Sequence, residues 1–480
     1  MNAIDMAPFT AWRPARTNQD VDLIIKIVGA AASALVKDWA VVAQSLIRKG
    51  LSVMLESGQV DSDRGTFVLT IRLATKPFCS MGSGCDVLVD LTGKDPEWRR
   101  LGLQPGSVLI WEPSPDDRTH FFLHQGVVAY PIPLTELTRS HGERFHGEAF
   151  AALGVLLHLL GVSESTLCRW TPSLSAPRSF TAGHDYARQY VEKRDVYALP
   201  SPSGDHQGGL LLTTEKAILL GYAESACEDR NTCGTELMTT PWHWVTQHLD
   251  RAHSMVSVLE SEWHPGVRAY RGPEGKVMVF SRAGDAALGS CPNDFKASHL
   301  FVAADIADAL RLTLLGHELI RTAVSDGVGI VIEDALTRRQ QTVEIRSLVD
   351  MTRRGRVADS FTRDGDLTPC ERAGDAEAEV GYVAWGAAQG VVCDAVGLCR
   401  SFGLRVAGWY PKAIRPFQHQ AMESFAKTVD RVVLVESDPA LGYWDELRSS
   451  FSFEYSLFTP PPGRSLTPMD IFFREGLGVE

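Results

Sequence analysis

The C-terminal third of the chain shows the clearest alternation of apolar and polar segments. An apolar run at residues 380–385 meets a glycine-containing turn at 386–390, and a helical stretch follows. Apolar runs at 404–409 and 431–436 are again separated by a turn and a helical segment. Strands that alternate with helices of this length indicate parallel pairing through right-handed crossovers. This part is therefore predicted to form an open α/β sheet.

The rest of the chain carries related patterns, so the expected fold class is α/β, with three Rossmann-like parallel-sheet domains in tandem. In the first domain, the predicted strands are 21–28, 51–56, 66–73 and 85–91. The expected division is an arm at 1–20, domains at 21–170, 210–336 and 379–460, a linker rich in Pro, Ser and Gly at 171–209, a charged linker at 337–378, and a tail at 461–480.

Composition and charge narrow the choice of partners. The chain has 480 residues and a net charge of −12, which argues against nucleic acid or an anionic membrane as the main partner. The longest apolar stretch, 149–162, is too short to span a bilayer and contains His158. The nine cysteines include no CxxC pair, which favours reduced thiols in a cytoplasmic protein and argues against an iron–sulfur cluster held by this chain alone. No metal-ligand pattern stands out, so no metal site is expected on this chain.

Three features of the C-terminal third carry a family resemblance. A tryptophan–glycine turn at 385–390 is followed by an Arg-Pro-Phe turn at 415–417 and by ESDPALG at 436–442. In this order they resemble the wG-x-x-x-G, rPFP-type and vvE-x-N-x-x-G segments in the C-terminal domain of the α subunit of 2-oxoacid:ferredoxin oxidoreductases. The resemblance implies thiamine diphosphate chemistry, and it implies that the domains have the thiamine-diphosphate type of fold.

The first domain resembles the γ domain of the same family. The segments ESGQVDSDRGT (56–66), AYPIPLTE (129–136) and FAALGVLLHLL (150–160) are similar to three of its motifs. At the first turn, however, the family has a glycine-rich loop, whereas this chain reads VGAAASALV (28–36). Because alanine restricts the close backbone approach that a phosphate cradle needs, a plain strand-to-helix turn is the alternative reading and coenzyme A use is doubtful.

The middle domain resembles the pyrimidine-binding domain, but it is shortened. The resemblance covers 214–222, 237–245, 255–263 and 272–284, and the chain then reaches its next strands sooner than the family does. The site residues that it implies are Glu260 and Thr240 as catalytic residues, with Glu260, Pro241, Ser281 and Gly284 as cofactor-binding residues.

Glu260 is the central candidate of this set. In thiamine enzymes, a carboxylate hydrogen-bonds the aminopyrimidine and promotes the tautomer that removes the thiazolium proton, and a buried glutamate suits this role because burial raises its pKa. The alternative is that Glu260 and Glu262 are surface carboxylates at a strand end. Thr240 has a similar alternative, as a helix-capping residue before Pro241.

The resemblance implies a subunit of a thiamine-diphosphate-dependent 2-oxoacid oxidoreductase. No Gly-Asp-Gly segment with the usual asparagine spacing is present, so the diphosphate, Mg²⁺ and any 4Fe–4S cluster are expected on a separate β subunit. The other expected partners are a small 2-oxo acid and a ferredoxin-like electron acceptor. Two alternatives stay open: a non-catalytic structural or regulatory partner that keeps the fold, and a non-oxidative thiamine-diphosphate decarboxylase or carboligase subunit.

Overall fold

The computed structural model describes sixteen stretches of the chain, and it divides into two compact units. Unit 1 comprises Met1–Leu211 and Gln340–Thr342, and unit 2 comprises Leu212–Arg339 and Val343–Glu480. The described residues are 21–61, 66–92, 102–113, 126–139, 147–162, 178–200, 209–225, 257–260, 267–271, 277–282, 298–321, 325, 327–344, 370–437, 451–460 and 465–476.

Unit 1 is built on a mixed sheet with the strand order β6-β5-β4-β1-β3-β2-β13-β7. The predicted strands 21–28 and 85–91 correspond to β1 and β4, which pair in parallel, and the sheet continues in parallel through β5 and β6, which were not predicted. By contrast, β3 pairs antiparallel with both β1 and β2. The bounds are β1 Asp22–Val28, β2 Ser52–Asp61, β3 Thr66–Ala74, β4 Cys85–Asp90, β5 Leu103–Trp111, β6 Val128–Pro131, β7 Gly209–Thr213 and β13 Arg339–Glu344.

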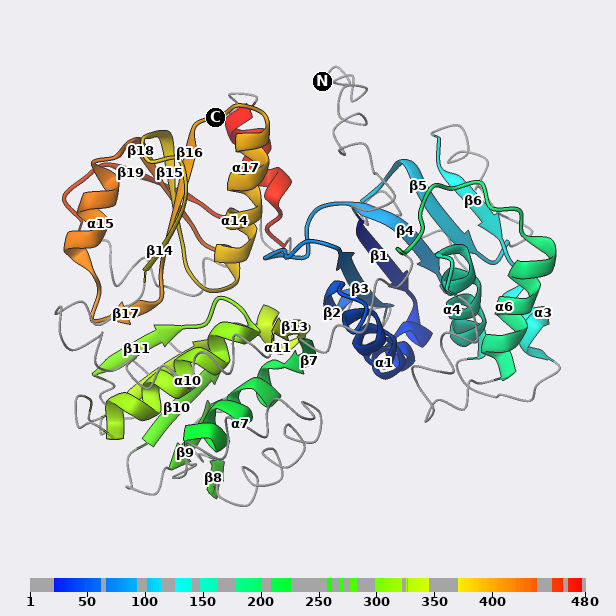
Figure 1. The fold of residues 1–480 in the computed structure, drawn as a ribbon, viewed down its shortest axis with the longest axis horizontal. Coiled ribbons are helices and arrows are strands. Elements are labelled where there is room, and N and C mark those ends of the chain that lie inside the picture. The colour runs from blue at the N-terminus through cyan, green and yellow to red at the C-terminus, as the bar shows by residue number, and fades with distance from the viewer. Residues whose placement is uncertain are drawn as a thin grey trace. The chain divides into compact units, whose positions relative to one another are not determined.

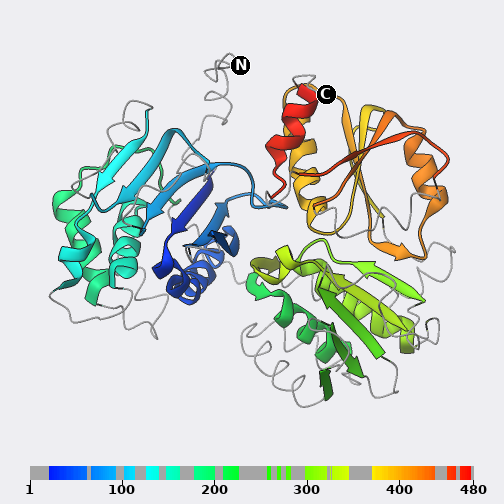
Figure 2. The ribbon, with the colours of Figure 1, turned by 180° about the vertical axis from the view of Figure 1, so that it is seen from behind.

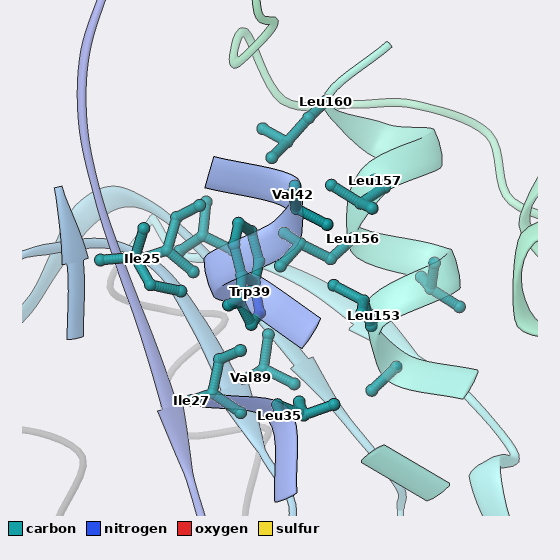
Figure 3. Packing of buried hydrophobic residues seen from close by; sticks show 14 of the residues in the cluster. Ile25, Ile27, Leu35, Trp39, Val42, Val89, Leu153, Leu156, Leu157 and Leu160 are labelled. Atoms are coloured by element: carbon teal, nitrogen blue, oxygen red, sulfur yellow. The ribbon is translucent and has the colours of Figure 1, made fainter. Parts of the chain in front are cut away.

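The helices of unit 1 cover one face of this sheet (Figures 1 and 2). Alternate residues of β1 point to that face, so Ile25 and Ile27 join the same apolar cluster as Trp39. Figure 3 shows Trp39 between these strand residues and the leucines of α4. The helices are η2 Ala30–Ala34, α1 Leu35–Ile47, α3 Leu134–Arg139, α4 Gly147–Leu159 and α6 Arg178–Tyr190.

The segment 171–209, which the sequence analysis interprets as a linker, contains α6. The backbones of α6 and α4 lie very close together. A Cβ added to Gly154 would collide with the backbone of Phe180, and one added to Gly183 would collide with the backbone of Ala151. Beyond α6, Tyr197 is also buried and donates a hydrogen bond to Asp86. The polar composition of 171–209 gives a weak helix signal, since Phe180 is the one large apolar residue among the buried positions of α6 and the others are small or polar.

Unit 2 contains two sheets, here called the middle lobe and the C-terminal lobe. The middle sheet has the order β17-β11-β12-β10-β9-β8, with parallel pairing among β10, β12 and β11. Helices α7 and α10 pack on each other and on one face of this sheet (Figure 1). The bounds are α7 Thr214–Ser225, β8 Ser257–Glu260, β9 Val267–Arg271, β10 Val277–Arg282, β11 His299–Val302, α10 Ile306–Arg321, β12 Val328–Ile332, α11 Asp334–Thr337 and β17 Ala413–Arg415.

The C-terminal lobe is doubly wound, as its sequence pattern predicts. Its sheet has the order β14-β16-β15-β18-β19, and β15 pairs in parallel with both β16 and β18. Helices α14 and α17 lie on one face, and α15 lies on the other (Figures 1 and 2). The bounds are β14 Cys370–Gly374, β15 Ala378–Ala384, α14 Gly386–Ser401, β16 Val406–Pro411, α15 His419–Ala426, β18 Val429–Val435, β19 Tyr455–Phe458 and α17 Pro468–Gly476.

The two lobes of unit 2 share an apolar core. Leu300 and Val331 of the middle sheet belong to the same buried cluster as Trp385 and Trp409 of the C-terminal lobe. The strand β17 follows β16 directly and pairs antiparallel with β11, so the chain passes from one sheet to the other at Lys412. Large buried aromatic residues contribute several kcal/mol each to such a core, which joins the two lobes.

We predict that Gly183→Val destabilises unit 1, because the added side chain forces the backbones of α4 and α6 apart. The free energy of unfolding should fall by about 1–3 kcal/mol or more. The matched control is Gln189→Val, which places the same side chain at an exposed position of the same helix. Denaturant unfolding of both variants measures the difference, and equal stability of the two would contradict the packing described.

Candidate functional site

The carboxyl ends of the middle strands meet at one edge of their sheet. β8 and β10 both run antiparallel to β9 and therefore share one direction. The register places Glu260 opposite Arg268, and Arg268 opposite Phe280. Phe280 pairs in parallel with Ile330, which in turn pairs in parallel with Phe301. The carboxyl ends of β12 and β11 therefore lie at the same edge of the sheet as that of β10. Ligands of open α/β sheets bind outside the carboxyl ends of their strands, which makes this edge the candidate site.

Two of the predicted site residues lie at this edge. Glu260 ends β8, and Ser281 lies next to the last residue of β10. Since one strand separates β8 from β10, their backbones are two strand spacings, about 10 Å, apart. Thr240, Pro241 and Gly284 lie outside the described residues. The register thus brings Glu260 and Ser281 to one edge.

The surroundings of Glu260 differ from the predicted parallel sheet. β8 is the last strand of the sheet and belongs to an antiparallel meander with β9 and β10. Residues 261–266 and 272–276 separate these strands in the sequence, and segments of this length are shorter than the crossovers that parallel neighbours need. Glu260 therefore ends an edge strand, at one end of the candidate site.

Glu333 follows β12 at the same edge and is buried, with 3% of its surface exposed. Its Oε2 atom accepts a hydrogen bond from the backbone N–H of Ala387 at 3.0 Å and another from the Ser437 hydroxyl at 3.0 Å. A Cβ on Gly386, whose φ is +51°, would collide with this carboxylate. The sequence places glycine where the carboxylate needs room, and the carboxylate lies at the positive end of the α14 dipole.

Lys412 is the second buried charge between the two lobes. Its ammonium donates hydrogen bonds to Asp308 Oδ2 at 2.5 Å and to Gln389 Oε1 at 2.7 Å, and 3% of its side chain is exposed. Asp305 caps the N-terminus of α10 by accepting a hydrogen bond from the backbone N–H of Asp308. Burial raises the pKa of Asp305, and the neighbouring Asp308 carboxylate adds to this shift. The Arg311 guanidinium pairs with the other oxygen of Asp308 at 3.0 Å.

These contacts define which part of the edge meets the C-terminal lobe. Glu333 and Asp308 come after β12 and β11, and their partners belong to the C-terminal lobe. Glu260 and Ser281 lie further along the same edge. A ligand held by Glu260 and Ser281 would therefore lie beside a closed junction between the lobes.

The sequence analysis missed Glu333, Asp308 and Lys412. A signal is present for two of them. Glu333 begins an acidic pair with Asp334 directly after the apolar strand β12, and Lys412 is the single residue between β16 and β17. A charged residue at the border of an apolar strand is costly to bury unless it is paired, so Glu333 and Lys412 indicate internal partners.

Within the stretches that the structure describes, no group of three or more His, Cys, Asp or Glu side chains is arranged to hold a metal ion. A search of the same stretches for a helix long and apolar enough to cross a membrane also finds none.

The architecture consists of an α/β unit with one mixed sheet and an α/β unit with two lobes. The solved structure of the 2-oxoglutarate:ferredoxin oxidoreductase from Magnetococcus marinus, determined with 2-oxoglutarate, coenzyme A and succinyl-CoA bound, matches this chain with a TM-score of 0.70. The match covers 96% of this chain and 100% of the other at 17% sequence identity. The resemblance predicted from the sequence is thus confirmed for the fold, and the neighbour is an oxidoreductase.

Shorter matches have low TM-scores. A pyruvate oxidoreductase subunit from Thermotoga maritima covers 36% of this chain at 15% identity, with a TM-score of 0.29. The γ subunit of a keto/oxoacid ferredoxin oxidoreductase from Geobacter sulfurreducens covers 35% at 18% identity, with a TM-score of 0.27. Neither a family model nor a curated protein matches the sequence.

We predict that Lys412→Met destabilises unit 2, because it leaves Asp308 charged and buried without its ammonium partner. The free energy of unfolding should fall by about 3–5 kcal/mol, and adding Asp308→Leu should recover much of the loss. The control is Arg405→Met, which removes an ion pair to Glu379 with both side chains about 60% exposed and should cost less than about 1 kcal/mol. Urea unfolding compares the variants, and equal losses at positions 412 and 405 would contradict this account.

Proposed function

We propose that this chain is a fused γ–α subunit of a thiamine-diphosphate-dependent 2-oxoacid oxidoreductase. The observation that carries the proposal is the fold match along essentially the whole chain to a 2-oxoglutarate:ferredoxin oxidoreductase. A separate β subunit supplies the diphosphate and Mg²⁺ site, with any 4Fe–4S cluster, and electrons pass to a ferredoxin-like acceptor. The substrate is a small 2-oxo acid.

The residues at the carboxyl edge of the middle sheet are compatible with the pyrimidine end of the cofactor. Strand register brings Glu260 to this edge, and a carboxylate is the acceptor type that an aminopyrimidine ring needs. Ser281 follows Phe280, which shares the row of Glu260, so Ser281 belongs to the other face of the sheet. Bound thiamine diphosphate supplies the nucleophilic carbon for decarboxylation of the 2-oxo acid. In this proposal, Glu260 holds the proton at the pyrimidine N1′, and Thr240, Pro241, Ser281 and Gly284 are the further cofactor residues that the family resemblance implies.

Coenzyme A use by the first turn of unit 1 is not part of this proposal. The turn is the short helix η2, in which Ala32 is fully buried, and a Cβ on Gly29 would approach Leu91 to 2.9 Å. A turn packed inward in this way supports a strand-to-helix connection rather than a pyrophosphate cradle. The bound coenzyme A in the Magnetococcus marinus structure belongs to that protein.

A second candidate function is a non-catalytic partner that keeps the fold. It is favoured by the position of Glu260 on the edge strand of an antiparallel meander and by the shortened middle domain. A non-oxidative thiamine-diphosphate decarboxylase or carboligase subunit is the remaining alternative. Native mass spectrometry of the complex purified from its own host separates these readings, because only the catalytic ones require a second chain together with thiamine diphosphate and Mg²⁺.

We predict that Glu260→Gln lowers turnover of the assembled complex by about 10²-fold or more, since the variant can no longer hold the pyrimidine proton. Glu262→Gln is the matched control, because it removes a carboxylate two residues further along the chain and should keep turnover within a few-fold of the wild type. Steady-state 2-oxo acid oxidation with a viologen dye as acceptor measures both. Full turnover in Glu260→Gln would rule out the assigned role, even if the complex contains the cofactor.

A further inference from the structure

The C-terminal lobe has a topological switch point that no described role uses. From β15 the chain passes through α14 to β16 on one side, and it then returns through α15 to β18 on the other side of β15. Doubly wound sheets bind ligands at such a reversal of strand order, outside the carboxyl ends of the strands, so the carboxyl ends of β15 and β18 mark the position here called the switch-point crevice.

Three features of this crevice converge on one carboxylate. The N-terminus of the 16-residue helix α14 offers the N–H of Ala387, and the loop after β18 offers the Ser437 hydroxyl. Gly386 supplies the room that the carboxylate needs. The group they hold is Glu333, which comes from the middle lobe and is 3% exposed. Donors from two different strand ends thus bind a single buried anion.

The opposite contact has the same form with the charges exchanged. The carboxyl end of β11 leads into the Asp308 carboxylate, and this group holds the ammonium of Lys412 from the C-terminal lobe. Each lobe therefore inserts one charged side chain into the ligand-binding edge of the other. Glu333 and Lys412 are both buried. Their contacts therefore differ from ion pairs at the exposed surface, which contribute little to stability.

We propose that the switch-point crevice of the C-terminal lobe is a carboxylate-binding site whose resident ligand is Glu333 of the same chain. The side chain acts as an internal ligand that keeps the two lobes closed and excludes external anions from the α14 N-terminus. Small carboxylates such as acetate are the class of ligand that this crevice takes when the glutamate is removed. The proposal does not depend on thiamine diphosphate or on a partner chain, so its test gives a result whether or not the proposed function is correct.

Thermal unfolding of the full-length chain carrying Glu333→Ala tests the proposal with acetate as the probe. The variant should lose about 4 °C or more in Tm, and millimolar acetate should restore much of this loss in a saturable manner. Sodium chloride at the same ionic strength should not. The wild type and the control Glu379→Ala, which removes an exposed carboxylate of the C-terminal lobe, should show no acetate-specific response.

An equal response to acetate and chloride in Glu333→Ala, or the same acetate response in the wild type, would overturn the proposal. If Glu333→Ala yields no folded protein, a double-mutant cycle with Glu333→Gln and Ser437→Ala decides the question. The internal-ligand contact predicts that the two Tm losses are not additive, because Glu333→Gln removes the charge that strengthens the Ser437 hydrogen bond and Ser437→Ala removes its donor. Additive losses would show that Ser437 does not bind Glu333 and would reject the site.

Discussion

Unit 2 depends on the burial of Lys412 at the single residue where the chain passes from one sheet into the other. Two strands of different sheets, β16 and β17, flank this lysine, so the residue cannot move without displacing both. Its ammonium is satisfied by Asp308 and Gln389, one from each lobe. A buried charge needs a closely placed and well-oriented partner, because desolvation costs several kcal/mol per ion and only a pair with good geometry offsets this cost. The pair therefore fixes the register of β17 against β11, and through it the relation between the two lobes.

The contact between the middle lobe and the C-terminal lobe also limits how far the candidate site extends along the edge of the middle sheet. On one side, Glu333 and the apolar cluster around Trp385 occupy the space between the lobes. On the other side, Glu260 and Ser281 lie toward the far strands of the same sheet edge. In the proposed function, this arrangement leaves the outer part of the edge for a cofactor shared with a second chain, because the inner part is filled by the junction between the lobes.

Sequence reasoning was strongest where one short-range pattern decides the structure. The runs in the C-terminal lobe alternate so regularly that the parallel pairing of β15, β16 and β18 follows from them. The antiparallel pairing of β8, β9 and β10 was not predicted, although Pro-Gly at 265–266 and Gly-Pro at 272–273, between these strands in the sequence, are turn signals. The candidate site shows the same limit: the strand-end position of Glu260 could be predicted, whereas the contact between Glu333 and Ser437 joins residues 104 positions apart.

The return of β13 to the first sheet has a consequence for how such a chain can evolve. Residues Gln340–Thr342 belong to unit 1, although the middle lobe separates them from the rest of that unit in the sequence, and Thr342 exchanges hydrogen bonds with the backbone of Val53. The N-terminal unit is thus not a contiguous segment, and no single cut in the gene yields it whole. A fusion of two ancestral polypeptides would at first be reversible. Once a strand from the second part completes the sheet of the first, separation removes a structural element, and the single-chain state becomes difficult to undo.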